Sequence, residues 1–136
     1  MEFSSKFAIV VADDLAQWQK LNVVAFLTSG VLCEDESSVG EEYRDASGVG
    51  YSPLCIQPIV MLKANREKLP TFLNRANGRG IRVAIYIEDM FETGHDAANR
   101  DTVTKYASSE LPLVGLGLRA DKRDVDKVLK GAKLHD

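Results

Sequence analysis

The sequence predicts a single α/β domain, a three-layer sandwich in which helices cover a mixed, mostly parallel sheet of about four strands. Patterns of buried strands alternate with patterns of helices along the whole chain, which is the signature of helices packed on such a sheet. The chain has 136 residues, the ordinary size of one domain. Hydrophobic residues make up 45% of it, which is enough for a core without a disulfide or a metal. We therefore expect one domain over residues 1–136.

The first strand is predicted at residues 6–11, where a charged residue precedes a β-branched apolar run. Asp13 and Asp14 follow as candidate caps of a helix over residues 15–28, because a short carboxylate can accept amide protons of the first turn. The second half of this helix is apolar nearly all round. A helix of that kind is covered on more than one side, so we expect a homodimer.

The segment 33–53 is rich in acidic residues and glycine and has no sustained period. A loop of this length in a compact domain is either functional or mobile, and both interpretations stay open. Its residues 45–51 are predicted to form a lid or rim over the site. A second strand is expected over residues 54–62, where Pro58 lacks the amide hydrogen of a strand ladder and indicates an edge position or a bulge.

The second half of the chain continues the alternation. It predicts a helix over 65–76 capped by Asn65, a strand over 81–87, a partly helical stretch over 93–109, a strand over 111–118, and a last helix from Asp121 to about 130 that Gly131 stops.

Two motifs favour ordinary structural roles. Gly115, Gly117 and Ala120 match the spacing of a dinucleotide fingerprint, but too few residues follow for the strand that the fingerprint needs. We expect a close backbone approach within the sheet there instead, and we predict no cofactor. Two cysteines and two histidines lack the spacing of zinc ligands, so we predict no metal. These four residues are Cys33, Cys55, His95 and His135.

The charge and the cysteine count bound the partners. A net charge of −3 and a pI of about 5.4 argue against broad binding to nucleic-acid phosphates, which needs a basic excess. Two cysteines and the lack of a secretory segment favour a reducing compartment, so we expect a cytoplasmic protein. No apolar run reaches the length that spans a bilayer, so no membrane partner is expected.

Three stretches, in order, resemble the type II peptidyl-tRNA hydrolases over almost the whole chain. They are KFAIVVADDL from Lys6, YIEDMFET ending at Thr93, and LVGLGLRADKRDVDKV from Leu113, closed by the GAKL ending at Leu134. Closer still is the similarity to the uncharacterised family catalogued as domain of unknown function two thousand, which shares that fold. The resemblance implies a type II peptidyl-tRNA hydrolase-like fold and, if the chain is an enzyme, a related hydrolase.

Only some of the residues in the hydrolase motifs are matched in this chain. Their aspartate and threonine after the third strand match Asp89 and Thr93. The arginine between these two positions is replaced by Glu92, which should repel phosphate. A lysine in their first helix corresponds to Lys20 with a gap of one residue. The glutamine and histidine that follow in the enzymes fall on apolar or small residues here, and Asn22 is a polar replacement nearby.

These matches define a predicted site at the carboxyl ends of the strands, where ligands bind in α/β sheets. In this hypothesis Lys20 holds an anionic group, Asn22 and Thr93 orient a polar ligand, and Asp89 fixes Lys20 or acts as a base. Two further carboxylates, Asp14 and Asp45, complete the set of ligand-binding residues. The alternative for Asp14 is a helix cap and for Asp89 the start of a turn.

The favoured function is binding of, or action on, a small polar or anionic ligand in this pocket. One alternative is a divergent peptidyl-tRNA or related ester hydrolase, with tRNA as a partner that the acidic charge disfavours. The other alternative is a non-catalytic dimeric interaction module.

Overall fold

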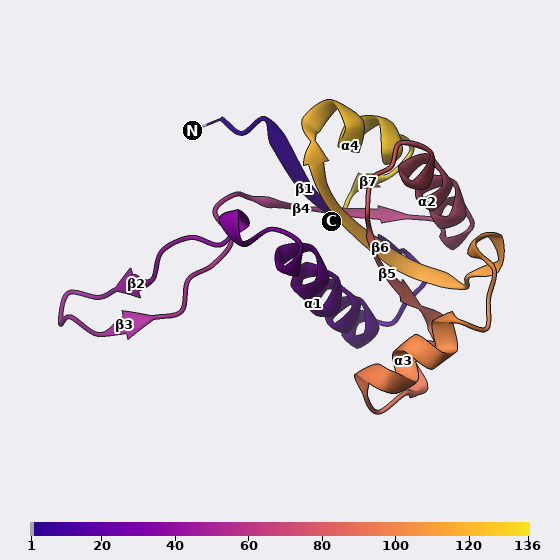
Figure 1. Cartoon of the computed structure of the whole chain (residues 1–136), viewed down its shortest axis with the longest axis horizontal. Coiled ribbons are helices and arrows are strands. Elements are labelled where there is room, and N and C mark those ends of the chain that lie inside the picture. Colours follow the sequence, from indigo (N-terminus) through magenta and orange to yellow (C-terminus); the bar gives the residue numbers. More distant parts are fainter. Residues whose placement is uncertain (1) are drawn as a thin grey trace.

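The structure is a computed structural model that describes residues 2–136. A five-stranded mixed sheet in the order β5-β6-β1-β4-β7 lies at its centre, with helix α1 on one face and α2 and α4 on the other (Figure 1). The strands are β1 (Ser5–Ala12), β4 (Ile59–Ala64), β5 (Ala84–Ile87), β6 (Leu113–Asp121) and β7 (Lys133–Leu134). The helices are α1 (Gln17–Cys33), α2 (Leu69–Gly78), α3 (Asp96–Val103) and α4 (Lys122–Val128), and 3-10 turns span Glu36–Ser38, Arg66–Lys68, Glu88–Glu92 and Ser108–Glu110. The α/β class and the mixed sheet flanked by helices are confirmed.

The prediction of a mostly parallel sheet is wrong. Strand β1 pairs in parallel with β4, whereas the pairs β1–β6, β5–β6 and β4–β7 are antiparallel. Strands β1, β4 and β5 run in the same direction, as the alternation of strands and helices implies, but β6 inserts between β1 and β5 in the opposite direction. The order of elements along the chain does not show which strands become neighbours. The fifth strand, β7, has two residues and leaves no periodic signal.

The core is densest where β1 crosses the centre of the sheet. All six residues from Phe7 to Ala12 are buried. Across the sheet, the predicted apolar face of α2, including Phe72 and Leu73, is buried as well. On the other face α1 lies so close to β6 that a Cβ atom at Gly115 would come within 2.6 Å of Val23 Cγ1. The glycines of β6 therefore serve a close contact with helix α1, rather than the close approach within the sheet that was predicted, because a side chain at Gly115 would push α1 away.

Helix α1 begins later than predicted. Its N-cap is Ala16, whose amide donates to Gln19 Oε1 at 3.0 Å, so Asp13 and Asp14 are not its caps. Asp14 instead forms an ion pair with Arg66. A guanidinium is a stronger partner for a carboxylate than a backbone amide, and the sequence pattern of a cap cannot reveal that competitor.

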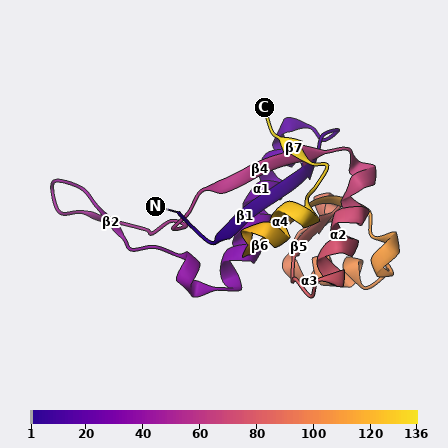
Figure 2. The same ribbon diagram turned by 90° about the horizontal axis from the view of Figure 1, so that it is seen from above.

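Residues 33–53, predicted to lack regular structure, finish α1 and then form a projecting hairpin. We call residues 40–54 the arm; it contains β2 (Tyr43–Arg44) paired with β3 (Gly50–Tyr51). The arm extends away from the body in both views (Figures 1 and 2). Its turn is closed by Asp45, whose carboxylate accepts from the Ser47 amide at 2.9 Å and from the Tyr51 hydroxyl at 2.7 Å. Within one copy the predicted lid 45–51 therefore covers no part of the body.

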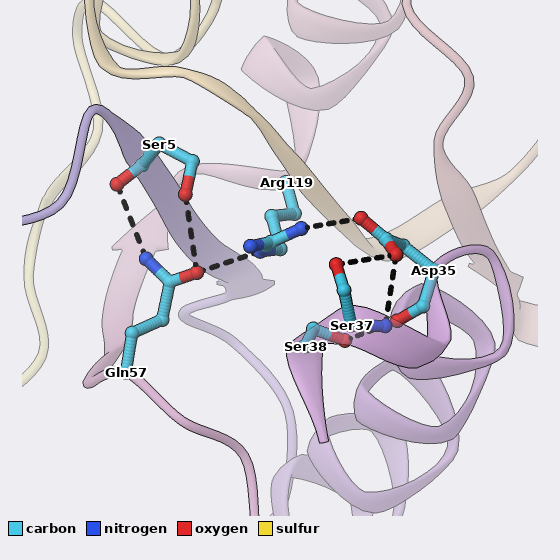
Figure 3. Close-up of polar contacts among 6 residues, drawn as sticks. All are labelled: Ser5, Asp35, Ser37, Ser38, Gln57 and Arg119. Atoms are coloured by element: carbon cyan, nitrogen blue, oxygen red, sulfur yellow. Dashed lines mark hydrogen bonds and ion pairs between the residues drawn. The ribbon is translucent and has the colours of Figure 1, made fainter. Parts of the chain in front are cut away.

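Arg119 on β6 ties both ends of the arm to the sheet (Figure 3). Its Nε donates to Gln57 Oε1 at 2.6 Å, and its Nη1 donates to Asp35 Oδ2 at 3.0 Å. Gln57 is itself held by Ser5, whose carbonyl accepts from Gln57 Nε2 at 3.1 Å. Hydrogen bonds from Ser37 and then from Arg119 outweigh desolvation and lower the pKa of Asp35. Asp35 precedes the arm and Gln57 follows it, so the arm leaves the body from a fixed base.

Candidate functional site

The carboxyl ends of β1, β4 and β5 lie at one edge of the sheet, where a cluster of charges joins them. Arg66, just after β4, lies 3.2 Å from Asp14 Oδ1 and also forms an ion pair with Glu88. Desolvation alone would lower the pKa of Arg66, but the hydrogen bonds to Glu88 and Asp14 raise it. The predicted ligand residue Asp14 is therefore part of a charge cluster that holds three strand ends together.

A cavity of about 270 Å³ opens at the same end of the molecule, between the first half of α1, the turn Glu88–Glu92 and the start of α3. We call it the aromatic pocket. It is lined by Trp18, Asn22, Phe26, Tyr86, Met90, Phe91, Thr93, Gly94, His95, Asp96 and Asn99.

Aromatic rings form one continuous wall of this pocket. The ring centroids of Trp18 and Phe91 are 5.9 Å apart with an interplanar angle of 70°, an edge-to-face contact. Phe91 lies 5.3 Å from Tyr86, which lies 5.9 Å from Phe26. Burial raises the pKa of Tyr86, so its hydroxyl stays protonated at neutral pH. The wall offers apolar aromatic surface with little charge, and its ring planes are inclined to one another by 39–70°.

Polar groups complete the lining of the pocket. The Thr93 hydroxyl donates to the Met90 carbonyl at 3.0 Å and is also in hydrogen-bonding contact with the Asn99 side chain. Nδ1 of His95 accepts from the Ala98 amide at 3.2 Å, so a neutral ring carries its proton on Nε2 and can donate it to a ligand. Asn22 is exposed and adds an amide at the rim.

The structure brings together two of the four residues that were predicted to converge. Asn22 and Thr93 line the aromatic pocket. Lys20 instead lies 3.3 Å from His135 Nε2, beside the β7 edge. The reason is helical geometry: residues two apart on an α-helix point about 200° apart, so Lys20 and Asn22 cannot face one cavity.

The remaining predicted residues lie elsewhere. Asp89 Oδ2 accepts from the Tyr106 hydroxyl at 2.8 Å, and that hydrogen bond raises the pKa of Tyr106. Neither Asp89 nor Lys20 lines the aromatic pocket. Asp45 is confined to the turn of the arm, where hydrogen bonds from Tyr51 and Val49 lower its pKa.

The residues that the sequence analysis overlooked are the aromatic ones. Trp18, Asn22 and Phe26 are spaced four apart, so they form one stripe on α1. That spacing is visible in the sequence, but the match to the hydrolase motif drew attention to Lys20. Arg66 also had a signal, because it follows a predicted strand at the edge where ligands bind.

The charges around the pocket do not favour an anion. Within residues 2–136, the lining of the aromatic pocket includes no lysine or arginine. Its one carboxylate, Asp96, is paired with Arg100 at 2.6 Å.

The same part of the chain contains no group of three or more His, Cys, Asp or Glu side chains arranged to hold a metal ion. In residues 2–136 no helix has the length and apolar character that crossing a membrane requires.

Comparison with known proteins identifies the family. Residues 5–136 match the family described as "Protein of unknown function (DUF2000)", and the chain belongs to that family. A solved structure of a protein of unknown function, Atu0240 from Agrobacterium tumefaciens strain C58, is 48% identical in sequence. The match covers 99% of this chain and 100% of that one, with a TM-score of 0.96. The comparison with curated proteins gives no match.

The high score has a consequence for the arm. The arm, residues 40–54, makes up about a ninth of the chain, so a TM-score of 0.96 over 99% of the residues requires that most of the arm superposes too. The projecting hairpin is therefore shared with the solved relative.

Proposed function

We propose that this chain binds a small, neutral ligand with a flat ring in the aromatic pocket. The observation that carries the proposal is the wall made by Trp18, Phe91 and Tyr86, with neighbouring rings 5.3–5.9 Å apart, in a cavity that hydrogen-bonding groups also line. Apolar walls with a few convergent polar groups are the usual form of small-molecule sites. A ring stacked on the wall would present its polar edge to Thr93 and His95.

The ligand class follows from size and charge. A cavity of about 270 Å³ lies just below the range of about 300–1,000 Å³ that is usual for ligand sites, so a single or fused heterocycle fits better than a nucleotide. The anionic ligand expected from Lys20 loses its support, because Lys20 contacts His135 outside the pocket. The hydrolase alternative gains none, because Asp89 is engaged by Tyr106.

The chain carries its own reporter for the test, since Trp18 is its single tryptophan. We expect a saturable change in Trp18 fluorescence on titration with at least one of adenine, uracil, nicotinamide and cytosine. Asn22→Ala and Thr93→Val should each weaken that binding about three- to tenfold, the loss of roughly one hydrogen bond. Lys127→Ala, on the far side of the sheet, is the matched control and should bind normally.

Lys20→Ala decides between the two versions of the site. It should leave binding unchanged, since Lys20 points to the opposite side of α1. A large loss with Lys20→Ala, or no spectral change with any of the four compounds, would overturn the proposal.

A further inference from the structure

We infer that two copies of this chain associate through α1, and that the arm of each copy covers the aromatic pocket of the other. The starting observation is where apolar surface is exposed. Among residues 2–136, ten large hydrophobic side chains are 39–73% exposed, and nine of them lie on α1 or on residues 39–56. Exposed apolar groups scattered singly need no explanation, but a concentration of this kind marks an interaction surface.

Helix α1 presents an outer face whose large apolar side chains stay more than half exposed in residues 2–136, although Trp18 touches Phe91 and Phe26 touches Tyr86 at one side of it. Its inner face packs Val23, Leu27 and Val31 against the sheet. On the outer face Trp18 and Phe26 are each 57% exposed, and Leu21 is 65% exposed.

Apolar grooves flank this outer face on both sides. One, of about 490 Å³, runs between α1, β5 and α3 and includes Phe26 and Val103. The other, of about 450 Å³, lies between α1 and the base of the arm and includes Leu32 and Leu54. The exposed face is therefore a broad surface rather than a single ridge.

The arm carries a second exposed apolar surface, and the body of its own copy does not cover it. Tyr43, Val49 and Tyr51 on it are each about half exposed, at 52–53%. The arm projects away from the body (Figure 2), and the contacts of Arg119 fix its base. It cannot fold back onto its own α1 without breaking them. Its apolar side chains therefore need a surface on another molecule.

Lengths and directions on the chain fit a second copy as that molecule. Helix α1 has 17 residues and is about 25 Å long, and the extended arm reaches about 25 Å from its base. Two α1 helices packed antiparallel about a twofold axis place the C-terminal end of one beside the N-terminal end of the other. The arm, which follows the C-terminal end, then starts beside the N-terminal half of the second α1, where Trp18 and the aromatic pocket lie.

The area and charge also favour self-association. Nine large side chains exposed to this degree offer on the order of 800 Å² of surface per copy, the size of one side of a standard interface. The first turn of α1 holds no acidic residue, so its helix dipole is free to attract the acidic arm residue Glu41. An isologous interface uses one surface twice, and this chain carries both halves of it.

The inferred dimer depends on the proposed function in one respect only, which is the role given to the aromatic pocket. Each pocket would be open in an isolated chain and closed by the arm of the other copy. Dimerisation itself does not depend on a ligand. A failure of all four heterocycles to bind would therefore remove the ligand proposal and leave the dimer to be judged separately.

The first experiment measures mass by sedimentation equilibrium on the full chain. We expect twice the chain mass of 15.0 kDa. Leu21→Asp and Phe26→Asp should give single chains with unchanged circular dichroism, because both side chains are exposed. The matched control is Leu134→Asp, which changes the tenth exposed residue, outside both segments and 73% exposed; it should remain a dimer. A mass of 15.0 kDa up to about 100 μM would overturn the inference.

The second experiment asks whether the arm reaches the pocket of the other copy. Acrylamide quenching of Trp18 is measured in the unaltered chain and in Val49→Ser/Tyr51→Ser. Within one copy neither residue lines the pocket of Trp18, so a local effect is absent. Because an interface excludes water, we expect quenching to rise about twofold in the arm variant. A dimer whose Trp18 quenching is the same in both proteins would refute the arm's role.

Discussion

The two faces of α1 are both apolar, yet they differ in what covers them. On the inner face Val23 and Leu27 meet β6 so closely that glycine is required at position 115. On the outer face Trp18 and Leu21 are more than half exposed. An apolar sequence pattern therefore indicates that a surface becomes buried. It does not indicate whether the same chain or a second molecule covers that surface. The following predictions test each side of this contrast.

The inner face should be the least tolerant of change. Gly115→Val places a side chain where even a Cβ would lie 2.6 Å from Val23, so we expect a loss of about 3 kcal/mol in the free energy of unfolding. Urea denaturation gives the value. Gly78→Ala is the control, since nothing lies within 4 Å of its Cβ position. Equal midpoints for the two variants would mean that α1 does not depend on this close contact.

A change at the base of the arm should have the second-largest effect on the free energy of unfolding. Arg119→Met keeps much of the side-chain packing but removes the bonds to Gln57 and Asp35, so we expect a loss of about 1–2 kcal/mol in unfolding free energy. The amides of Gly40 and Ile56, which bond across the arm base at 2.8 and 2.9 Å, should exchange about tenfold faster.

The control for that variant is a more exposed arginine. Arg82 is 82% exposed in its pair with Glu34. Arg82→Met should therefore lower the free energy of unfolding by less than about 0.5 kcal/mol. Unaltered exchange at Gly40 and Ile56 in Arg119→Met would show that Arg119 does not hold the arm.

The turn of the arm should show the smallest effect, and it depends on pH. The pKa of Asp45 lies below its ordinary 3.8 because Tyr51 and Val49 donate to it. Its stabilisation of the folded turn is therefore complete above pH 3.8 and is lost as the pH falls through the lower, folded-state pKa. The Ser47 and Val49 amide shifts in nuclear magnetic resonance spectra should report this titration.

Asp45→Asn supplies the comparison for the titration. Because its side chain has no proton to gain in this range, the Ser47 and Val49 shifts should stay constant. A titration midpoint above 3.8 in the unaltered chain would contradict the hydrogen bonds of the turn.

Local features of the fold could be predicted because their signals are local. The run from Phe7 to Ala12 contains its own evidence of burial, and all of it is buried. Asp121 caps α4 by accepting from the Arg123 amide at 2.9 Å, as its position predicts. Gly131 ends that segment with φ at 107°, a conformation that favours glycine.

The arrangement of those features could not be predicted in the same way. Nothing in the β6 sequence shows that it lies between β1 and β5, because neighbours in a sheet are chosen by long-range packing. At the site, matching single residues to a motif selected Lys20 and Asp89. The geometry of the helix and of the edge of the sheet leaves the predicted Asn22 and Thr93 in the aromatic pocket, but it places Trp18 there rather than Lys20 and Asp89.

The most direct test of the whole account is a crystal structure of the unaltered chain, in which the surroundings of Trp18 are measured. We predict that the arm of a second copy, related by a twofold axis, lies within about 4 Å of the Trp18 ring. A structure in which Trp18 faces solvent, with both arms free of the neighbouring α1, would contradict the account.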